Sequence, residues 1–90
     1  GQVYAIAVFN IGAVDAWLKF HDTPVLPTAG ANVSQSYCIP GATTGAGLVF
    51  NIDKGITFLN GIAITVVDGI AVTDSTVVAA ANISVNIYYK

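Results

Sequence analysis

The last nine residues of the chain, residues 82–90, alternate between two sets of side chains. One side carries Ile83, Val85, Ile87 and Tyr89, and the other carries Ser84, Asn86, Tyr88 and Lys90. A period of two residues is typical of a β-strand with one face in a core and the other in solvent. The segment is rich in β-branched and aromatic residues and has no Gly or Pro, so it predicts a regular strand paired on both sides within a sheet.

Six further segments show strand patterns, and no segment shows the pattern of an amphipathic helix. These strands are expected at residues 2–10, 16–21, 33–39, 48–52, 56–59 and 61–67. The first two are expected to form an antiparallel hairpin. Asp53-Lys54-Gly55 predicts the turn after residue 52. Asn60-Gly61 predicts a type I′ hairpin turn, with a bulge at Gly61 in one longer strand as the alternative.

Residues 70–81 give the weakest pattern, and residues 77–81 favour either a short strand or a helical turn. Short strands with turns every 8–12 residues or so are typical of two-sheet proteins. The sequence therefore predicts an all-β fold, an antiparallel β-sandwich or jelly roll of about seven short strands. Ninety residues are expected to form one domain, residues 1–90, with one small core.

Charge is scarce in this chain. Charged residues make up 9% of it, against about 25% in ordinary soluble domains, whereas hydrophobic residues make up 54%. Sheet edges with few charges are poorly protected against association. Much of the surface is therefore expected to be covered by other subunits, in preference to a monomer with a Ser/Thr/Asn surface.

The composition also bears on partners. A net charge of −2 without a basic patch argues against nucleic-acid binding, and no apolar run reaches the roughly 18 residues needed to span a bilayer. A single Cys cannot cross-link the fold, so packing and assembly are expected to stabilise it. The chain has no Met, so Gly1 is not expected to be its native start.

Few residues are candidates for chemistry. His21, the only His, is predicted to be exposed to solvent or in a subunit contact, because a triad or metal site would need further partners. Cys38 is predicted to be a buried structural thiol. A calcium site built from Asp53, Asp68 and Asp74 is disfavoured, because EF-hand spacing is absent. No catalytic residue, metal or cofactor is therefore predicted, and the glycine-rich residues 41–47 lack the Lys of a P-loop.

Aromatic residues are the best candidates for core or interface anchors, because they dominate the energetics of both. The predicted anchors are Tyr4, Trp17, Phe20, Phe58 and Tyr88. Trp17 and Tyr88 would suit sugar stacking only if they were exposed side by side, and packing is the favoured role.

Short motifs throughout the chain resemble a family of small proteins encoded among the structural genes of tailed bacteriophages. The matching residues are Val3-Tyr4, Asn10, Leu18-Lys19-Phe20-His21-Asp22, Pro27-Thr28-Ala29-Gly30, Ile39-Pro40, Gly55-Ile56-Thr57-Phe58, Asn60-Gly61-Ile62-Ala63-Ile64-Thr65, Asn82, Val85-Asn86 and Tyr88-Tyr89-Lys90. The resemblance implies a β-sandwich virion protein of the cement or decoration kind and carries over no catalytic residues. Family members begin with an extra strand before the position of Gly1, so a native N-terminal strand or arm is expected to be missing here.

The expected function is that of a capsid cement or decoration subunit on the virion surface. Its expected partners are the major capsid protein, or another virion protein, and copies of itself in a homo-oligomer such as a trimer. One alternative is a tail-fibre or surface β-domain that binds a host glycan, and another is a self-polymerising filament subunit whose first strand comes from a neighbour. An enzyme is not expected, because the chain has one His, one Cys and no acidic pair in a recognisable motif.

Overall fold

The computed structural model covers residues 1–90 and describes all of them except residues 43, 72, 77 and 79–81. The described chain forms six strands and no α-helix. The strands are β1 (Gln2–Asn10), β2 (Ala16–Asp22), β3 (Gln35–Ile39), β4 (Ala46–Thr57), β5 (Ile62–Val67) and β6 (Ile83–Tyr89). The predicted all-β class is confirmed, with six strands rather than about seven.

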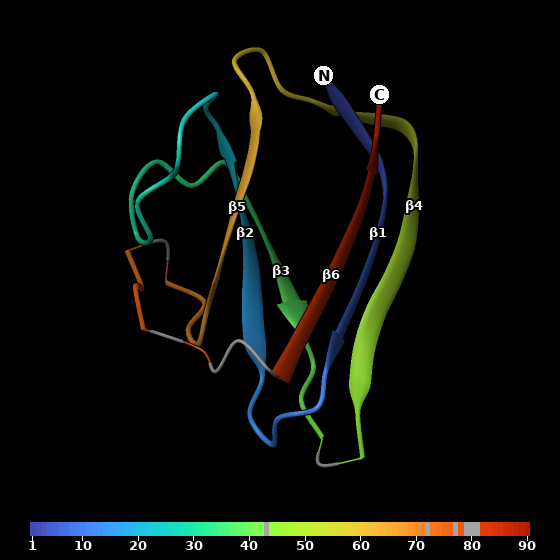
Figure 1. The fold of residues 1–90 in the computed structure, drawn as a ribbon, viewed down its shortest axis with the longest axis vertical. Coiled ribbons are helices and arrows are strands. Elements are labelled where there is room, and N and C mark those ends of the chain that lie inside the picture. The colour runs from blue at the N-terminus through green and yellow to red at the C-terminus, as the bar shows by residue number, and fades with distance from the viewer. Residues whose placement is uncertain (43, 72, 77, 79–81) are drawn as a thin grey trace.

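The strands form two antiparallel three-stranded sheets that face each other as a β-sandwich (Figure 1). The first sheet has the order β4-β1-β6, and the second has the order β3-β2-β5. The two termini lie side by side at one end of the sandwich. There the N–H of Gln2 donates to the carbonyl of Lys90 at 3.0 Å, and the N–H of Lys90 donates back at 2.9 Å.

The core lies between the sheets and is built from the alternating apolar side chains of both central strands. β1 contributes Val3, Ile6 and Val8, and β2 contributes Ala16, Leu18 and Phe20, all of them buried. Removing these apolar side chains from water is the main favourable contribution to folding.

Four aromatic rings form the centre of this core and join the two sheets. The ring centroid of Phe20 lies 5.5 Å from that of Phe58 and 5.9 Å from that of Tyr37. Tyr37 in turn lies 5.1 Å from Phe50 of β4. Such tilted and edge-on contacts add stability beyond the burial of area alone. Burial also raises the pKa of the Tyr37 hydroxyl above its ordinary value.

Both predicted hairpins are wrong, because the chain crosses between sheets at those connections. β1 and β2 belong to different sheets, and so do β4 and β5. A type I′ turn needs positive φ at both central residues, and neither Asn60 nor Gly61 has it. In the observed arrangement the buried side chains of β1 and β2 meet in one core between the two sheets.

The two strands predicted on either side of residues 53–55 are one strand. β4 runs through this segment, and its register with β1 shifts there: Val3 lies opposite Ile56, whereas Ala5 lies opposite Asn51. Gly55 has a φ of 78°, which glycine adopts readily. The turn-forming residues therefore produce a bulge that bends β4, after which pairing with the start of β1 resumes.

The prediction that the C-terminal strand is paired on both sides is also wrong. β6 has the predicted alternation, but it pairs only with β1 and forms the edge of its sheet. The predicted short strand or helical turn at residues 77–81 lies outside the described residues, apart from Val78. The described part of the chain has no helix long and apolar enough to cross a membrane.

Candidate functional site

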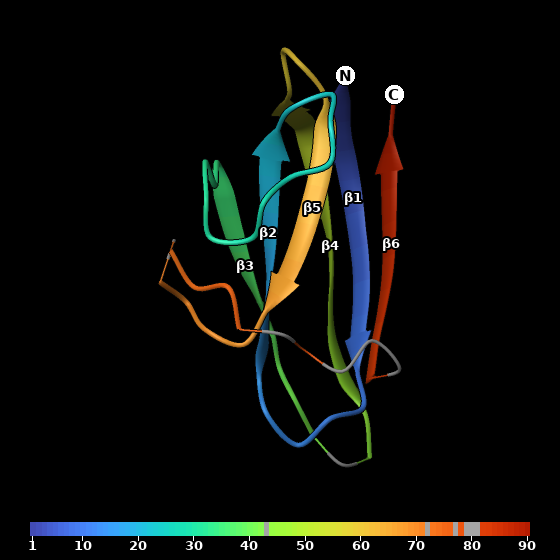
Figure 2. The same cartoon turned by 60° about the vertical axis from the view of Figure 1, so that its left-hand side comes forward.

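The outer faces of the two sheets differ sharply. The segments that follow β2 and β5 fold back over the outer face of the β3-β2-β5 sheet (Figure 2). Lys19 and His21 point to this face from β2, and their exposed fractions are 0% and 2%. The prediction that His21 is exposed is therefore wrong. Its place on the polar side of the strand is as expected, but loops cover that side.

Both ring nitrogens of His21 have protein partners. Nδ1 lies 3.0 Å from the carbonyl oxygen of Ala31, and Nε2 lies 2.8 Å from Oγ1 of Thr65. Because a carbonyl oxygen only accepts, Nδ1 carries a proton and donates it. In the neutral ring Nε2 then accepts from the Thr65 hydroxyl. His21 thus fastens the loop after β2 to β5, and this arrangement leaves no ring nitrogen free for a metal or a substrate.

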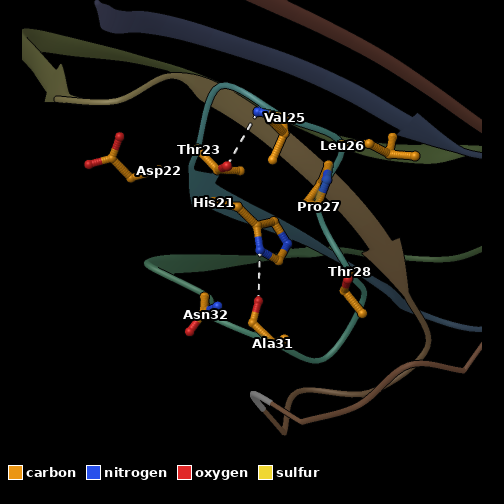
Figure 3. Close-up of a pocket in the computed structure, with 9 residues that line it drawn as sticks. All are labelled: His21, Asp22, Thr23, Val25, Leu26, Pro27, Thr28, Ala31 and Asn32. Carbon is orange, nitrogen blue, oxygen red and sulfur yellow. Dashed lines mark hydrogen bonds between the residues drawn. The ribbon is translucent and has the colours of Figure 1, made fainter.

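A hollow of about 370 Å³ lies between this loop and the strand. It is lined by His21, Asp22, Thr23, Val25, Leu26, Pro27, Thr28, Ala31 and Asn32. Figure 3 shows that the Asp22 side chain points away from the His21 ring. The side chains of His21 and Asp22 therefore do not face each other across the hollow. Each of them already forms hydrogen bonds with other groups of the protein.

The Asp22 carboxylate holds the connection between β4 and β5. Its Oδ1 accepts from the N–H groups of Asn60 at 2.7 Å and Gly61 at 3.1 Å, and its Oδ2 accepts from that of Leu59 at 3.2 Å. The hydrogen bond from Asn60 is the main reason that the pKa of Asp22 lies below its ordinary value, although desolvation opposes it. This carboxylate therefore has a structural role.

We expect Asp22→Asn to lower the melting temperature at neutral pH, because an amide oxygen accepts these hydrogen bonds less strongly than a carboxylate does. Since the pKa of Asp22 is lower in the folded state, its stabilisation is present above the unfolded value near 3.8. That stabilisation is lost as the pH falls through the folded value. Thermal unfolding from pH 7 to pH 2 should show the gap between native protein and variant closing at the acid end.

Asp53→Asn, at an exposed position of β4, is the matched control for this pH series. It should give a melting curve close to that of the native protein across the range. A gap for Asp22→Asn that stayed constant down to pH 2 would contradict the structural role of the ionised carboxylate.

Lys19 is buried under the segment that follows β5. Its ammonium group donates a hydrogen bond to the carbonyl of Ala71. The pKa of Asp74 in the same segment is lowered, mainly by the N–H of Thr76, which donates to it at 2.9 Å, and to a smaller extent by the charge of Lys19. The lysine therefore holds this segment against the sheet.

The remaining candidates for chemistry are separated. Cys38 is half-buried rather than fully buried, and its pKa is raised, first by burial and then by the negative charge of Asp15. A raised pKa makes a thiol less reactive. Within the described residues, no group of three or more His, Cys, Asp or Glu side chains could hold a metal ion.

The outer face of the β4-β1-β6 sheet, in contrast, carries no covering segment in the described chain (Figures 1 and 2). The strand register places nine residues on it, in three adjacent rows. They are Ala5, Ala7 and Phe9 of β1, Gly47, Val49 and Asn51 of β4, and Ser84, Asn86 and Tyr88 of β6. We call this set the uncharged face, because none of its residues carries a charge at neutral pH.

Large apolar side chains on the uncharged face are open to solvent. The exposed fractions are 49% for Phe9, 66% for Val49 and 61% for Tyr88. Phe9 packs over Gly47, where a Cβ would lie 2.7 Å from the Phe9 ring and 2.3 Å from the Val8 carbonyl. Glycine is therefore required at this position. Large exposed apolar side chains grouped on one uncharged sheet face are typical of an interaction site.

The predicted anchor residues occupy three different environments. Phe20 and Phe58 are buried in the core, and Tyr4 and Trp17 are half-buried. Tyr88 lies on the uncharged face, whereas Trp17 points to the outer side of the other sheet. Trp17 and Tyr88 therefore face away from each other and do not form a joint stacking platform for a sugar.

Two features of the surface were not recognised in the sequence. The uncharged face escapes prediction because residues 2–10 carry apolar side chains on both sides of the strand, so their pattern does not show which side is exposed. The covered face escaped prediction because alternation places a side chain on a face but does not show what covers that face. The length of the connections, residues 23–34 and 68–82, was the available signal, since long loops usually pack on the domain.

Comparisons of the chain with protein-family models, with curated proteins and with solved structures give no match. The case for a function therefore depends on the geometry above and on the motifs described in the sequence.

Proposed function

We propose that this chain is a structural protein of a tailed-phage virion, a capsid cement or decoration subunit. In this role it binds the major capsid protein and copies of itself, and it stabilises the shell by covering joints between capsid subunits. The resemblance to small phage structural proteins suggests the setting. The observation that carries the proposal is the uncharged face, which offers exposed apolar side chains and no charge on an otherwise stable sandwich.

Two further exposed apolar residues lie just beyond the end of β1. Ile11 and Val14 follow β1 in the chain, and their exposed fractions are 58% and 69%. Neither the uncharged face nor this pair of residues includes a Lys, which is the residue that most often protects an exposed sheet from association. Burial of these side chains against a partner would remove apolar area from water, and no ionic partner would be required.

The size of the face decides how such a subunit would bind. It is roughly 10 Å wide between its outer strands and about 14 Å long, from ordinary strand spacing and rise. That is well below the roughly 800 Å² per partner of a standard stable interface. One contact of this size is weak, but many subunits on one lattice bind with the avidity of the array. A repeated surface such as a capsid is therefore a better partner than a single soluble protein.

Quantitative mass spectrometry of purified virions tests the proposal. We expect the chain to be present in a number of copies comparable to that of the major capsid protein. Val49→Lys puts a charge on the uncharged face, in the row that β4 contributes, and because burying an unpaired charge is costly it should reduce the copy number at least tenfold.

The control is Leu26→Lys, the same kind of change at a highly exposed residue outside the uncharged face. It should leave the copy number unchanged. Absence of the chain from virions, or a handful of copies at the tail, would defeat the proposal. Equal losses for both variants would show that the uncharged face is not the contact.

A further inference from the structure

β6 forms a free edge of its sheet in the described sandwich. It pairs with β1 on one side only, and Figure 2 shows it standing at the margin of the molecule. The N–H of Ile11 donates to the carbonyl of Asn82, and Gln2 and Lys90 exchange two hydrogen bonds at the other end. Hydrogen-bonded pairs alternate along an antiparallel ladder. The backbone groups of Ile83, Val85, Ile87 and Tyr89 therefore point away from β1, toward the free side.

No residue of β6 blocks this edge. The seven residues of the strand include no Lys, Asp, Pro or Gly, the residues by which natural proteins usually protect an edge. The other long edge strand, β4, carries Asp53 and Lys54 and the bulge at Gly55. β3 has five residues and is followed by Pro40. β6 is thus the longest edge strand without a blocking residue.

A hollow lies next to the free edge of β6. Its volume is about 470 Å³, and it is lined by Gly1, Ile62, Ile64, Ile87, Tyr89 and Lys90. β5 and β6 border it from opposite sheets, so the sandwich is open on this side. Most of the lining is apolar, and apolar side chains from a strand added to β6 would lie over it.

We propose that this edge pairs with β6 of a second copy of the chain. The two strands run antiparallel around a two-fold axis at Asn86, and the sheets join into one of six strands. This inference deepens the proposed function, because it specifies how one copy contacts the next. It requires no residue outside the described chain.

The register follows from the direction of the backbone groups. Only residues whose N–H and C=O point outward can pair across the new contact. An axis at Asn86 places Val85 opposite Ile87 of the other copy, and Ile83 opposite Tyr89. All four outward-facing residues are then paired, whereas moving the axis by one residue leaves an end residue without a partner.

The side chains are compatible with this register. Val85 and Ile87 point to the core side of the sheet, so those of the two copies meet beside the apolar hollow. The two Asn86 side chains meet on the outer side, where their amides can hydrogen-bond to each other. No like charges are brought together, because Lys90 falls opposite Asn82. Such self-complementarity favours a second copy over an unrelated strand.

The contact is small, which sets the expected strength. Two seven-residue strands meet over about 24 Å, and an edge contact of that length buries less than a standard interface. We therefore expect a dimer that dissociates in the micromolar range or above, and that becomes persistent when copies are held close together on a surface.

Asn86→Lys tests the register directly. In the proposed dimer the two new lysines lie opposite each other at the axis, and like charges in directly opposed positions destabilise a strand pair. Sedimentation velocity over micromolar to millimolar concentrations should show dimers of the native chain and at least tenfold weaker association of the variant. An equal mixture of Asn86→Lys and Asn86→Asp should restore the dimer, because opposite charges then face each other.

Asn51→Lys is the matched control, since Asn51 is an exposed residue of the same sheet face on the far strand β4. It should dimerise like the native chain. Hydrogen exchange should show that protection of the Val85 and Ile87 amides rises with protein concentration. A native chain that stays monomeric at every concentration, or protection that rises at β5 amides instead, would overturn the inference.

The two proposals fail separately. A chain that dimerises through β6 but is absent from virions would contradict the proposed function and leave the pairing intact. A native chain that stays monomeric in solution but is present in virions at a copy number comparable to that of the major capsid protein would contradict the pairing and leave the virion role intact.

Discussion

Replacing Phe20 with alanine is expected to lower the free energy of unfolding by about 3–5 kcal/mol, the usual cost of truncating a buried Phe. Phe20 is fully buried and its ring contacts those of Phe58 and Tyr37. The substitution removes the side chain through which both sheets are joined and leaves a cavity between them. Since domains of this size are stable by only about 5–15 kcal/mol, chemical denaturation should show a much lower midpoint or no folded baseline at all.

Phe9→Ala is the same substitution of Phe by Ala, but on the uncharged outer face of the β4-β1-β6 sheet, where Phe9 is 49% exposed. We expect its effect on unfolding to be below about 1 kcal/mol, and its effect on virion occupancy to be large. Comparison of Phe20→Ala with Phe9→Ala therefore separates an effect on the free energy of unfolding from an effect on binding to the virion. Equal destabilisation by both would contradict the division between core and uncharged face.

The sequence was a good guide to which residues form strands and which faces are apolar. The alternation in residues 82–90 predicted that Ile83, Val85 and Ile87 share the core side, because a strand repeats every two residues. In β1 the alternation is interrupted between Val3 and Ala5, so Val3 lies in the core with Ile6 and Val8. The fold class followed from the same pattern. The number of strands was overestimated because turn-forming residues in β4 also suit a bulge.

The sequence was a poor guide to pairing. Alternation determines the face on which a side chain lies, but it does not determine which strand lies alongside. The alternation in β1 and β2 is compatible with a hairpin, and it is equally compatible with the observed arrangement, in which the two strands belong to different sheets. The choice depends on contacts between residues far apart in the chain, such as those of Phe20 with Phe58, and these cannot be deduced from local spacing.

The candidate surfaces depend on the same long-range contacts. Lys19 and His21 have the pattern of solvent-facing residues and are nonetheless buried, because loops cover them. Phe9 and Val49 have the pattern of core residues and are nonetheless exposed. The free edge of β6 is likewise visible only once the sheet order is known. Each of these features is set by what lies next to a strand, which the sequence pattern does not determine.

Asn10→Ala is expected to destabilise the fold by about 2–3 kcal/mol, because it leaves polar partners of a buried side chain unsatisfied. Asn10 is 1% exposed at the end of β1. Its Nδ2 donates to the carbonyls of Val14 at 2.9 Å and Ile39 at 3.3 Å, and its Oδ1 accepts from the N–H of Gly12 at 2.8 Å. This one amide shapes the crossing between the sheets and ties it to the end of β3.

Asn51→Ala, at an exposed position on the uncharged face, is the control and should change the unfolding free energy by less than about 0.5 kcal/mol.

Asn10→Asp tests donation itself, since an ionised carboxylate accepts from Gly12 but cannot donate to the two carbonyls. Burial raises the pKa of such a carboxyl in the folded state, so the variant should come closest to the stability of the native protein at low pH and fall further below it as the pH rises through that value. Denaturant titrations at pH 3 and pH 7 measure this difference. If Asn10→Asp matched the native protein at both pH values, donation by Asn10 would not be what holds the crossing in place.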